Sequence, residues 1–507
     1  MSELQAANER IAFLEEKVAK LEALIEWFKK HSFGTGKSER QDALQLQLQL
    51  KELEAAKEDL VQKQRITYER DKPKPRPIPA ERFKNLPVKE TVVVEPVEVQ
   101  ADPDLYERIG EETTFEVDIT PPKLFKREIV RPKYRHKIDK SHPPVIAPAP
   151  KRPIEGSYAS AGLIAWILLS KFRDHLPLYR QEGMLRRWNG PIPRQTMCDW
   201  VAAAAFLLEV IYWKIKEGLL GGDYLQADET PIQFIDPDLK KGKAQIGHFW
   251  LMGQPEGPVF IEWHQGRGQE HAEELLKGFK GILQTDGYAG YNPVHGENRP
   301  VTRVACFAHC RRKFAEALKP YPVQASFMLR LIGNLYHLDN EWERDGITDP
   351  AQRAHLRKRD FQLTLRLLKK AALKLRERHR PTSEMGKACS YLLGQWDALV
   401  RICDYGQVRL DNNLIENAVR PTKLGAKNWL FIGAPHAGKR SAIIYTLLLS
   451  CQRCGIDAHA YIKDLLTRLP HMSNQDDYTH LLPQNWKPPV SHDDPIRHVL
   501  DVETVTV

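Results

Sequence analysis

The stretch Tyr224-Leu-Gln-Ala-Asp-Glu-Thr-Pro231 decides the predicted fold, because it places an acid in a short strand-like run. Side chains alternate along a strand, so Gln226 and Asp228 should share one face while Glu229 points to the other. Asp228 and Glu229 therefore cannot both serve one site. Pro231 lacks a backbone donor and should end central pairing just after the acid, which leaves Asp228 at a strand end, where ligands commonly bind.

Two further acids stand in comparable settings downstream. Asp286 follows the apolar run Ile282-Leu-Gln-Thr285 and precedes a glycine, as expected at the end of a second strand. Glu416 closes the stretch Asp411-Asn-Asn-Leu-Ile-Glu416, which is typical of a helix start. The alternative for Glu416 is a capping box, with Asn413 as the N-cap and Glu416 at N3. The bases and aromatic residues that follow Glu416 favour a functional acid that faces a phosphodiester backbone.

The order of the elements around these acids is that of a ribonuclease H-like α/β sheet. Phe249-Trp-Leu-Met252 and Val259-Phe-Ile-Glu-Trp263 flank a Gly/Pro turn and predict a hairpin after the Asp228 strand. In that architecture the first and fourth strands are neighbours, so Asp228 and Asp286 should lie side by side. The elements expected after the hairpin are a helix over 269–279, strands over 281–285 and 302–307, and a basic helix from about His309.

Residues from about 315 to 405 predict an all-α insertion between the second and third acids. This part of the chain is highly charged, and its apolar residues recur at helical spacing, as at Leu329, Ile332 and Tyr336. The predicted fold class is therefore multidomain α/β, in which a ribonuclease H-like catalytic domain over 223–455 is interrupted by helices.

The first 70 residues predict an oligomerisation segment. Apolar residues recur at alternating spacings of three and four from Leu4 to Phe28, which is the a/d seam of a coiled coil, and a Leu-rich helix is expected from Asp42 to about Ile66. An amphipathic helix packed on its own domain is the alternative. A coiled coil would make the chain a homo-oligomer.

Residues 71–155 predict a proline-rich linker with a basic part that contacts DNA. Fifteen of the 35 prolines lie in 71–153, which excludes long helices. Residues 123–152 carry 10 bases and 2 acids, and bases interleaved with aromatic residues suit contacts to phosphates. A solvated linker paired with the neighbouring acidic block is the alternative, although alternation over 115–119 predicts a small sheet. The candidate DNA contacts here are Arg131, Lys133, Arg135 and Lys137.

Residues 156–222 predict a helical domain with a helix-turn-helix-like arrangement. Two apolar helices are followed by the turn Asn189-Gly-Pro-Ile-Pro193 and by a helix that opens with Arg194, Gln195 and Thr196. In a helix-turn-helix the second helix enters the major groove, so these three residues are candidate DNA contacts. A purely structural helix pair is the equal alternative.

Composition limits the classes of function. The 507 residues carry a net charge of +9 with a pI near 9.0, which suits a polyanionic partner. No apolar run approaches the roughly 20 residues of a membrane span, and the seven cysteines are not arranged as a secreted disulfide framework. We therefore expect a cytoplasmic protein without a membrane partner. Residues 456–507 predict a C-terminal helix, followed after about Leu469 by a poorly ordered tail.

Several stretches in one order resemble the transposases of the insertion sequence 66 family. They are Leu225-Gln-Ala-Asp-Glu-Thr-Pro231, Thr285-Asp-Gly-Tyr-Ala-Gly-Tyr291, His309-Cys-Arg-Arg-Lys-Phe314, Asp411-Asn-Asn-Leu-Ile-Glu-Asn-Ala-Val-Arg-Pro421 and Lys427-Asn-Trp-Leu-Phe-Ile-Gly433. The resemblance implies that Asp228, Asp286 and Glu416 are an Asp-Asp-Glu (DDE) catalytic triad. One departure is that family members carry a cysteine-rich zinc module, whereas residues 71–155 contain no cysteine. No zinc is therefore expected.

The resemblance implies a DNA transposase that cleaves 3′ ends and transfers strands. Three carboxylates suit two Mg²⁺ ions roughly 3.5–4 Å apart, for which Mn²⁺ can substitute, with Asp228 between the ions. His309 is an auxiliary candidate that would orient a phosphate or water, and a core histidine is its alternative. Further candidate DNA contacts are Arg311, Arg312, Arg420, Lys423, Lys427, Lys439 and Arg440.

The expected partners are the terminal repeats of the element, target DNA, further copies of the chain and small accessory proteins of the same element. The first alternative function is a catalytically inactive DNA-binding regulator that keeps the fold, which would bind an element end without nicking it. A ribonuclease on the same sheet is the second. It would cleave RNA–DNA hybrids and have no use for a coiled coil.

Overall fold

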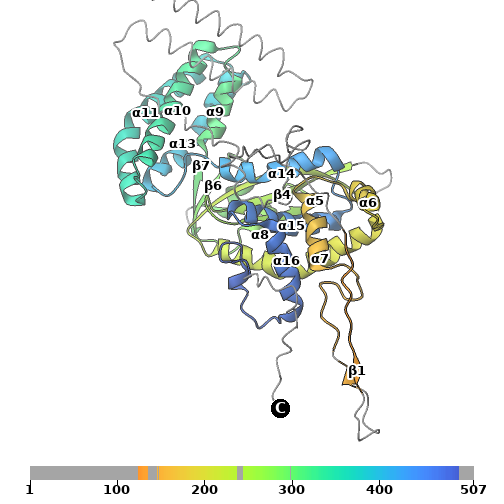
Figure 1. Cartoon of the computed structure of the whole chain (residues 1–507). Helices are drawn as coiled ribbons and strands as arrows, with labels where there is room; N and C mark the ends of the chain where they lie inside the picture. The colour runs from red at the N-terminus through yellow and green to blue at the C-terminus, as the bar shows by residue number, and fades with distance from the viewer. Residues whose placement is uncertain (1–123, 135–144, 147, 237–243, 297–298, 490–507) are drawn as a thin grey trace, which may run out of the picture. The chain divides into compact units, whose positions relative to one another are not determined.

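The computed structural model describes residues 124–134, 145–146, 148–236, 244–296 and 299–489. A five-stranded mixed sheet with the order β5-β4-β3-β6-β7 carries the candidate acids (Figure 1). β3 pairs antiparallel with β4 and parallel with β6, so the first and fourth strands of the sheet are neighbours as predicted. The strands are β3 (Tyr224–Ile235), β4 (Ala244–Gly253), β5 (Val259–His264), β6 (Gly281–Thr285) and β7 (Val301–Ala305).

The prediction that Pro231 ends the first strand is wrong. β3 continues to Ile235, and Pro231 itself stands opposite His248 in the ladder with β4. The N–H and C=O groups of one strand residue point to the same side, and the Pro231 carbonyl accepts a hydrogen bond from Lys423, away from β4. The N–H group that Pro231 lacks would therefore point to the β6 side of β3, where β6 has already ended. No hydrogen bond between strands is lost.

Helices cover the outer edge of the sheet at β5. The Thr446 hydroxyl accepts a hydrogen bond from Ile261 N (2.9 Å), and the Ser450 hydroxyl accepts one from Val259 N (3.1 Å). Both hydroxyls belong to α15 (Pro435–Arg453), and the Tyr212 hydroxyl of α7 (Arg194–Leu220) donates to the Ile261 carbonyl (3.0 Å). These contacts satisfy an edge that would otherwise be open to pairing with another strand.

The helices that precede the sheet in sequence share its hydrophobic core. α5 (Ala161–Phe172), α6 (Leu178–Arg187) and α7 pack with α15 and α16 (Ala458–Arg468) beneath the strands. Among the described helices, α7 is the one long and apolar enough to cross a bilayer. Its buried residues, including Leu208 and Ile215, lie in this core, which accounts for its apolar composition.

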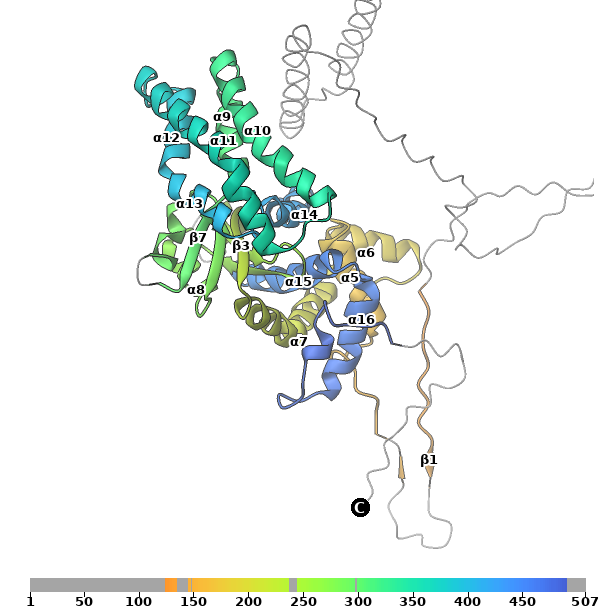
Figure 2. The same cartoon turned by 90° about the vertical axis from the view of Figure 1, so that its left-hand side faces the viewer.

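The predicted helical insertion is present on the β7 side of the sheet (Figures 1 and 2). The basic helix expected from about His309 begins at Phe307, a single residue after β7, and is the first of the inserted helices. Its helices are α9 (Phe307–Glu316), α10 (Pro322–Arg344), α11 (Pro350–Arg378), α12 (Glu384–Gly394) and α13 (Trp396–Val400). The first and last residues of the insertion lie next to each other at the sheet, because Phe307 N donates a hydrogen bond to the carbonyl of Leu410 (2.9 Å).

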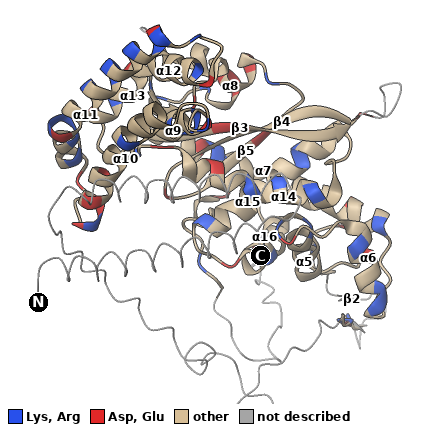
Figure 3. Ribbon diagram, turned by 90° about the horizontal axis from the view of Figure 1, so that it is seen from above, with Lys and Arg blue, Asp and Glu red and all other residues tan. Residues whose placement is uncertain are grey.

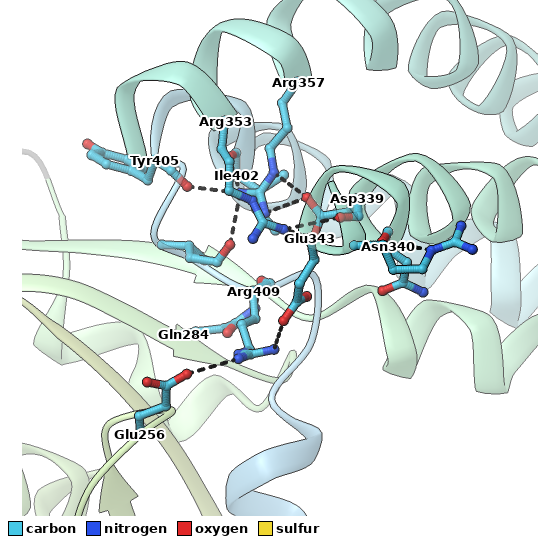
Figure 4. A network of polar contacts seen from close by, with 12 residues as sticks. Glu256, Gln284, Asp339, Asn340, Glu343, Arg353, Arg357, Ile402, Tyr405 and Arg409 are labelled. Carbon is cyan, nitrogen blue, oxygen red and sulfur yellow. Dashed lines mark hydrogen bonds and ion pairs between the residues drawn. The ribbon is translucent and has the colours of Figure 1, made fainter. Parts of the chain in front are cut away.

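A buried guanidinium holds the end of the insertion (Figure 4). The Arg357 side chain is 1% exposed and contacts Asp339 Oδ1 through Nη2 (2.8 Å). Its Nη1 donates to the carbonyl oxygens of Ile402 (3.2 Å), Tyr405 (3.0 Å) and Val408 (2.8 Å). Three backbone carbonyls of the returning segment are therefore fixed by one side chain of α11.

The C-terminal region departs from the predicted poorly ordered tail. Tyr478, Leu481 and Trp486 are buried, the Tyr461 hydroxyl donates to the Leu481 carbonyl (2.7 Å), and Trp486 Nε1 donates to Asp464 Oδ2 (2.9 Å). These aromatic anchors order the chain as far as residue 489 despite its prolines and acids.

The predicted N-terminal coiled coil and the small sheet over 115–119 lie outside the described residues. Within 124–146, β1 (Lys133–Tyr134) and β2 (Val145–Ile146) form a short antiparallel pair.

Candidate active site

The pairing of β3 with β6 sets the first two acids side by side. Tyr224 stands opposite Ile282, and Gln226 stands opposite Gln284. The same register two residues further on places Asp228 opposite Asp286, just beyond the last paired residues. Neighbouring strands lie about 4.8 Å apart, which is close enough for two carboxylates to share a bound cation.

The third acid lies in the first turn of α14 (Asn413–Trp429), which contacts β3 and β4. The capping-box alternative is wrong. The N-cap is Asn412, its side chain caps no backbone N–H, and Glu416 is the fourth helical residue. The Asn413 N–H instead donates a hydrogen bond to Asp411 Oδ1 (3.1 Å). The Glu416 carboxylate is therefore not used as a cap, and its Oε1 is buried without a hydrogen-bond partner among the described residues.

A buried polar cluster ties the segment before Glu416 to both acid-bearing strands. Gln284 Nε2 donates to the Arg409 carbonyl (2.8 Å), and Gln226 Nε2 donates to the Asp411 carbonyl (2.8 Å). Gln284 Oε1 accepts from Gln226 Nε2 (2.9 Å) and from the Tyr224 hydroxyl. The Tyr224 hydroxyl also accepts from Arg409 N (3.2 Å). These contacts fix the start of α14 relative to the two strands that carry the aspartates.

The electrostatics of the three acids are those of a concentrated negative site. Burial raises the pKa of Asp228 well above its usual range, and the nearby carboxylates of Glu229, Glu416 and Asp286 raise it further. Burial also raises the pKa of Glu416, against the opposing influence of Arg312. Like charges held together out of water repel one another, and a divalent cation relieves that repulsion. The all-oxygen donor set therefore fits Mg²⁺ or Mn²⁺.

His309 lies beside Glu416, as its position at the start of the basic helix allows. Its Nε2 is 3.5 Å from Glu416 Oε1, and Arg312 Nη2 is 3.8 Å from Glu416 Oε2. Burial and the positive charge of Arg312 lower the pKa of His309 to about 4. The imidazole is therefore neutral at neutral pH and can accept or donate a hydrogen bond at the acidic site.

Glu229 is held on the opposite face of β3 by residues that the sequence did not single out. Its carboxylate is 3% exposed, accepts from Arg267 Nε (3.1 Å) and accepts from the Tyr291 hydroxyl (3.0 Å). The Arg267 guanidinium lies 3.8 Å from the centre of the Tyr288 ring, and Tyr288 N donates to Asp286 Oδ1 (2.9 Å). A chain of contacts thus connects Glu229 with Asp286. The clustering of aromatic residues after Asp286 was the available signal.

The insertion contacts the turn that follows Asp286. Gly287 N donates to the Tyr391 hydroxyl (3.0 Å), and a Cβ at Gly287 would lie 2.8 Å from the Tyr391 ring. Arg303 of β7 reaches both the Asp286 carbonyl and the side chain of Gln395 (2.5 Å each). The inserted helices are therefore part of the support of the site.

Lys and Arg positions are marked along the ribbon in Figure 3, and the basic candidates near Glu416 differ in their exposure and contacts. Arg420 and Lys427 are exposed on α14, whereas Lys423 is half-buried and donates to the Pro231 carbonyl, which makes it a structural contact. Lys439 pairs with Glu209 of α7 (2.6 Å), and Arg440 is half-buried. Arg312 is exposed beside Glu416, and Arg311 is half-buried on the same helix.

The first turn of α7, which follows α6, lies at the surface of the protein. Arg194 and Gln195 are exposed and Thr196 is half-buried, while the Arg194 N–H donates to Glu182 Oε1 (3.1 Å). Arg131 and Lys133 belong to the described part of the basic stretch. Arg135 and Lys137 lie outside it.

The part of the chain that carries the three acids matches a known protein family. The model of the Transposase IS66 family matches residues 156–440, which include the sheet, the inserted helices and all three acids. The chain belongs to the IS66 transposase family. The IS66 C-terminal element matches residues 446–484 of the chain, and the model named Transposase C of IS166 homeodomain matches residues 20–90. Membership of the family supports a transposase role.

Three curated relatives of the chain come from Sinorhizobium fredii (strain NBRC 101917 / NGR234), and all are named as uncharacterized proteins. The protein y4qI is 29% identical over 496 residues, covering 93% of this chain and 90% of its own. The protein y4jD is 29% identical over 395 residues, covering 75% of this chain and 76% of its own. The protein y4hP is 27% identical over 510 residues, covering 93% and 89%.

Proposed function

We propose that the chain is a DNA transposase whose Asp228, Asp286 and Glu416 catalyse metal-dependent cleavage at the 3′ ends of an insertion sequence and the transfer of those ends to target DNA. The observation that carries the proposal is the convergence of three acids from β3, β6 and α14. The carboxylates of Glu416 and Asp286 both raise the pKa of Asp228, and that of Asp286 also raises the pKa of Glu416. The strand order β5-β4-β3-β6-β7 supports a ribonuclease H-like architecture for residues 223–455.

The reaction has two steps that use the same groups. In the first, water attacks the phosphorus at the element end, the bond to the 3′ oxygen breaks, and that oxygen leaves as a hydroxyl. In the second, the freed 3′-hydroxyl attacks a phosphodiester of target DNA, and a new bond forms as a target 3′ oxygen leaves. Bound Mg²⁺ ions would supply activation of the attacking oxygen and charge stabilisation for the leaving one.

In these steps the side chains of the protein would hold the metal ions, orient the reacting groups and balance the negative charge. Asp228, Asp286 and Glu416 would hold the metal ions, and Asp228 is close enough to the other two carboxylates for both to raise its pKa. The neutral imidazole of His309, 3.5 Å from Glu416, can orient a water or phosphate oxygen. Arg312 at 3.8 Å from Glu416 limits the repulsion between the acids before DNA arrives.

The remaining parts of the molecule are assigned DNA-binding and assembly roles. Arg420 and Lys427 on α14 and Arg312 on α9 would contact phosphates near the acids. The start of α7 would act as the second helix of a helix-turn-helix-like domain over 156–222. The proposed segment over 1–70 would join copies of this cytoplasmic protein. The basic part of 71–155 would add non-specific DNA contacts, and accessory proteins of the element would assist assembly.

Strand transfer in the presence of Mg²⁺ tests the catalytic role. A labelled duplex that carries the element end and a supercoiled target plasmid are incubated with the wild type, with Glu416→Gln and with Asp228→Asn. Glutamine keeps the size of Glu416 but is a poor ligand for a hard cation, so product should fall by at least about a thousandfold, which is about 4 kcal/mol. The control is Glu377→Gln, an exposed change on α11, which should retain full activity.

The other outcomes contradict the proposal in different ways. End binding without nicking by the wild type would identify a DNA-binding regulator. Cleavage of RNA–DNA hybrids without strand transfer would identify a ribonuclease. Full activity of Glu416→Gln would remove that residue from the triad.

A further inference from the structure

Two histidines and a glutamate form a second cluster of metal-binding side chains, outside the three acids. His264 ends β5, and His271 and Glu274 lie one turn apart on α8 (Gln269–Leu275). One ligand atom from each residue lies within 4.8 Å of the others. The imidazole rings are stacked, with 4.1 Å between their centres and 24° between their planes.

The contacts of these side chains leave their ligand atoms available. His264 Nε2 is buried without a hydrogen-bond partner among the described residues, and the nearest carboxylate oxygen, Glu262 Oε1, is 4.0 Å away. Glu262 is itself paired with Lys216 (2.9 Å). His271 Nε2 is 3.6 Å from Glu270 Oε1, a distance longer than a hydrogen bond. A buried ring nitrogen without a partner is costly, and a metal ion would satisfy it.

The surroundings allow a cation to enter and be neutralised. A surface pocket of about 410 Å³ reaches His264 and is also lined by Glu262 and His436. The facing charges are those of Glu262 on β5, Glu270 and Glu274 on α8, and Lys216 on α7.

We propose that His264, His271 and Glu274 bind a transition-metal ion, with Zn²⁺ the best match. Two imidazoles and one carboxylate are a donor set that suits Zn²⁺, with a water molecule in the fourth position. Mg²⁺ prefers oxygen ligands alone, so this site differs chemically from the three acids. The assignment revises the expectation from sequence that the chain binds no zinc.

The ion would fix the loop that carries Arg267. Residues 265–268 connect β5 with α8, and Arg267 from this loop contacts Glu229 and the ring of Tyr288. A metal bridge between His264 and α8 closes the loop at both of its ends, which restricts the conformations open to Arg267. The bound metal would thus act as a positioning device next to Asp286, without contacting the reacting atoms.

Metal binding by the full chain tests the site without DNA, so the test is independent of the proposed transposase activity. The purified chain is stripped with a chelator and titrated with Zn²⁺ against a chromophoric indicator, and Co²⁺ is added separately to record its visible spectrum. The variants are His264→Ala, His271→Ala and Glu274→Gln. The matched control is His337→Ala, which removes an exposed histidine that pairs with Glu341 on α10 (3.2 Å).

The wild type should bind one Zn²⁺ more than either histidine variant and should give Co²⁺ bands typical of a tetrahedral site. Glu274→Gln should bind at least about tenfold more weakly. Because Glu274 is exposed and glutamine has its shape, this variant stays folded even if a histidine variant does not. Amide exchange in residues 265–268 should slow when Zn²⁺ binds. Equal Zn²⁺ binding by the wild type and all three variants, or none by the wild type, overturns the proposal.

Discussion

Replacement of Gln284 by leucine should loosen the segment that positions Glu416. Leucine has a similar volume but cannot hydrogen bond, so the Arg409 carbonyl loses its donor and the Tyr224 hydroxyl loses its acceptor. Gln226 keeps its contact with the Asp411 carbonyl (2.8 Å). Each buried group left without a partner costs about 1–3 kcal/mol. Two such groups give a loss of about 2–6 kcal/mol in the stability of this junction.

Amide hydrogen exchange over residues 410–416 measures that loss directly. The lower limit of about 2 kcal/mol corresponds to roughly 30-fold faster exchange when the junction opens locally. Strand transfer should fall as well, because Glu416 is less well positioned. Gln233→Leu is the matched control, since Gln233 is an exposed glutamine on β3, and its effect should stay within about 0.5 kcal/mol. Exchange in Gln284→Leu no faster than in this control would refute the role given to the buried cluster.

Two further predictions concern the insertion and the acids. Arg357→Met should destabilise the inserted helices by about 3–5 kcal/mol in urea unfolding, because Asp339 and three carbonyls lose a buried cation, whereas exposed Arg359→Met should be nearly neutral. For Asp228, burial raises the pKa, so its contribution to the stability of the cation-free protein should be fully present below about pH 4 and decline as pH rises through the raised value. The melting-temperature gain from Mg²⁺ should therefore increase with pH, and Asp228→Asn should lessen that increase.

One measurement can contradict each of these two predictions. An Arg357→Met protein as stable as Arg359→Met would show that the returning segment is held by other contacts. A gain from Mg²⁺ that does not change with pH would show that the buried acids are not where the cation binds.

Much of the sheet was predictable because its strands contain apolar runs that stand between turns. The β6 strand matches its predicted bounds, and the hairpin of β4 and β5 follows from two apolar runs around a Gly/Pro turn. The error at Pro231 has a local cause. A proline is excluded from a strand only where its N–H would be bonded, and the early end of β6 could not be read from residues 224–231.

The convergence of the acids was predictable in part. Strand order placed Asp228 beside Asp286, but the position of Glu416 depends on hydrogen bonds from Gln226 and Gln284 to backbone carbonyls more than a hundred residues away in sequence. Such contacts have no periodic signal. The same holds for Arg267, which is one base among many until the fold brings it to Glu229.

The hydrogen bond between Phe307 N and the Leu410 carbonyl makes the number of residues between the second and third acids nearly irrelevant to their separation in space. At the far end of the inserted helices, Tyr321 packs against His379 with 4.6 Å between ring centres, away from the junction where Arg357 and Tyr391 act. Relatives could therefore lengthen, shorten or decorate that tip during evolution while the distance between their carboxylates stayed the same.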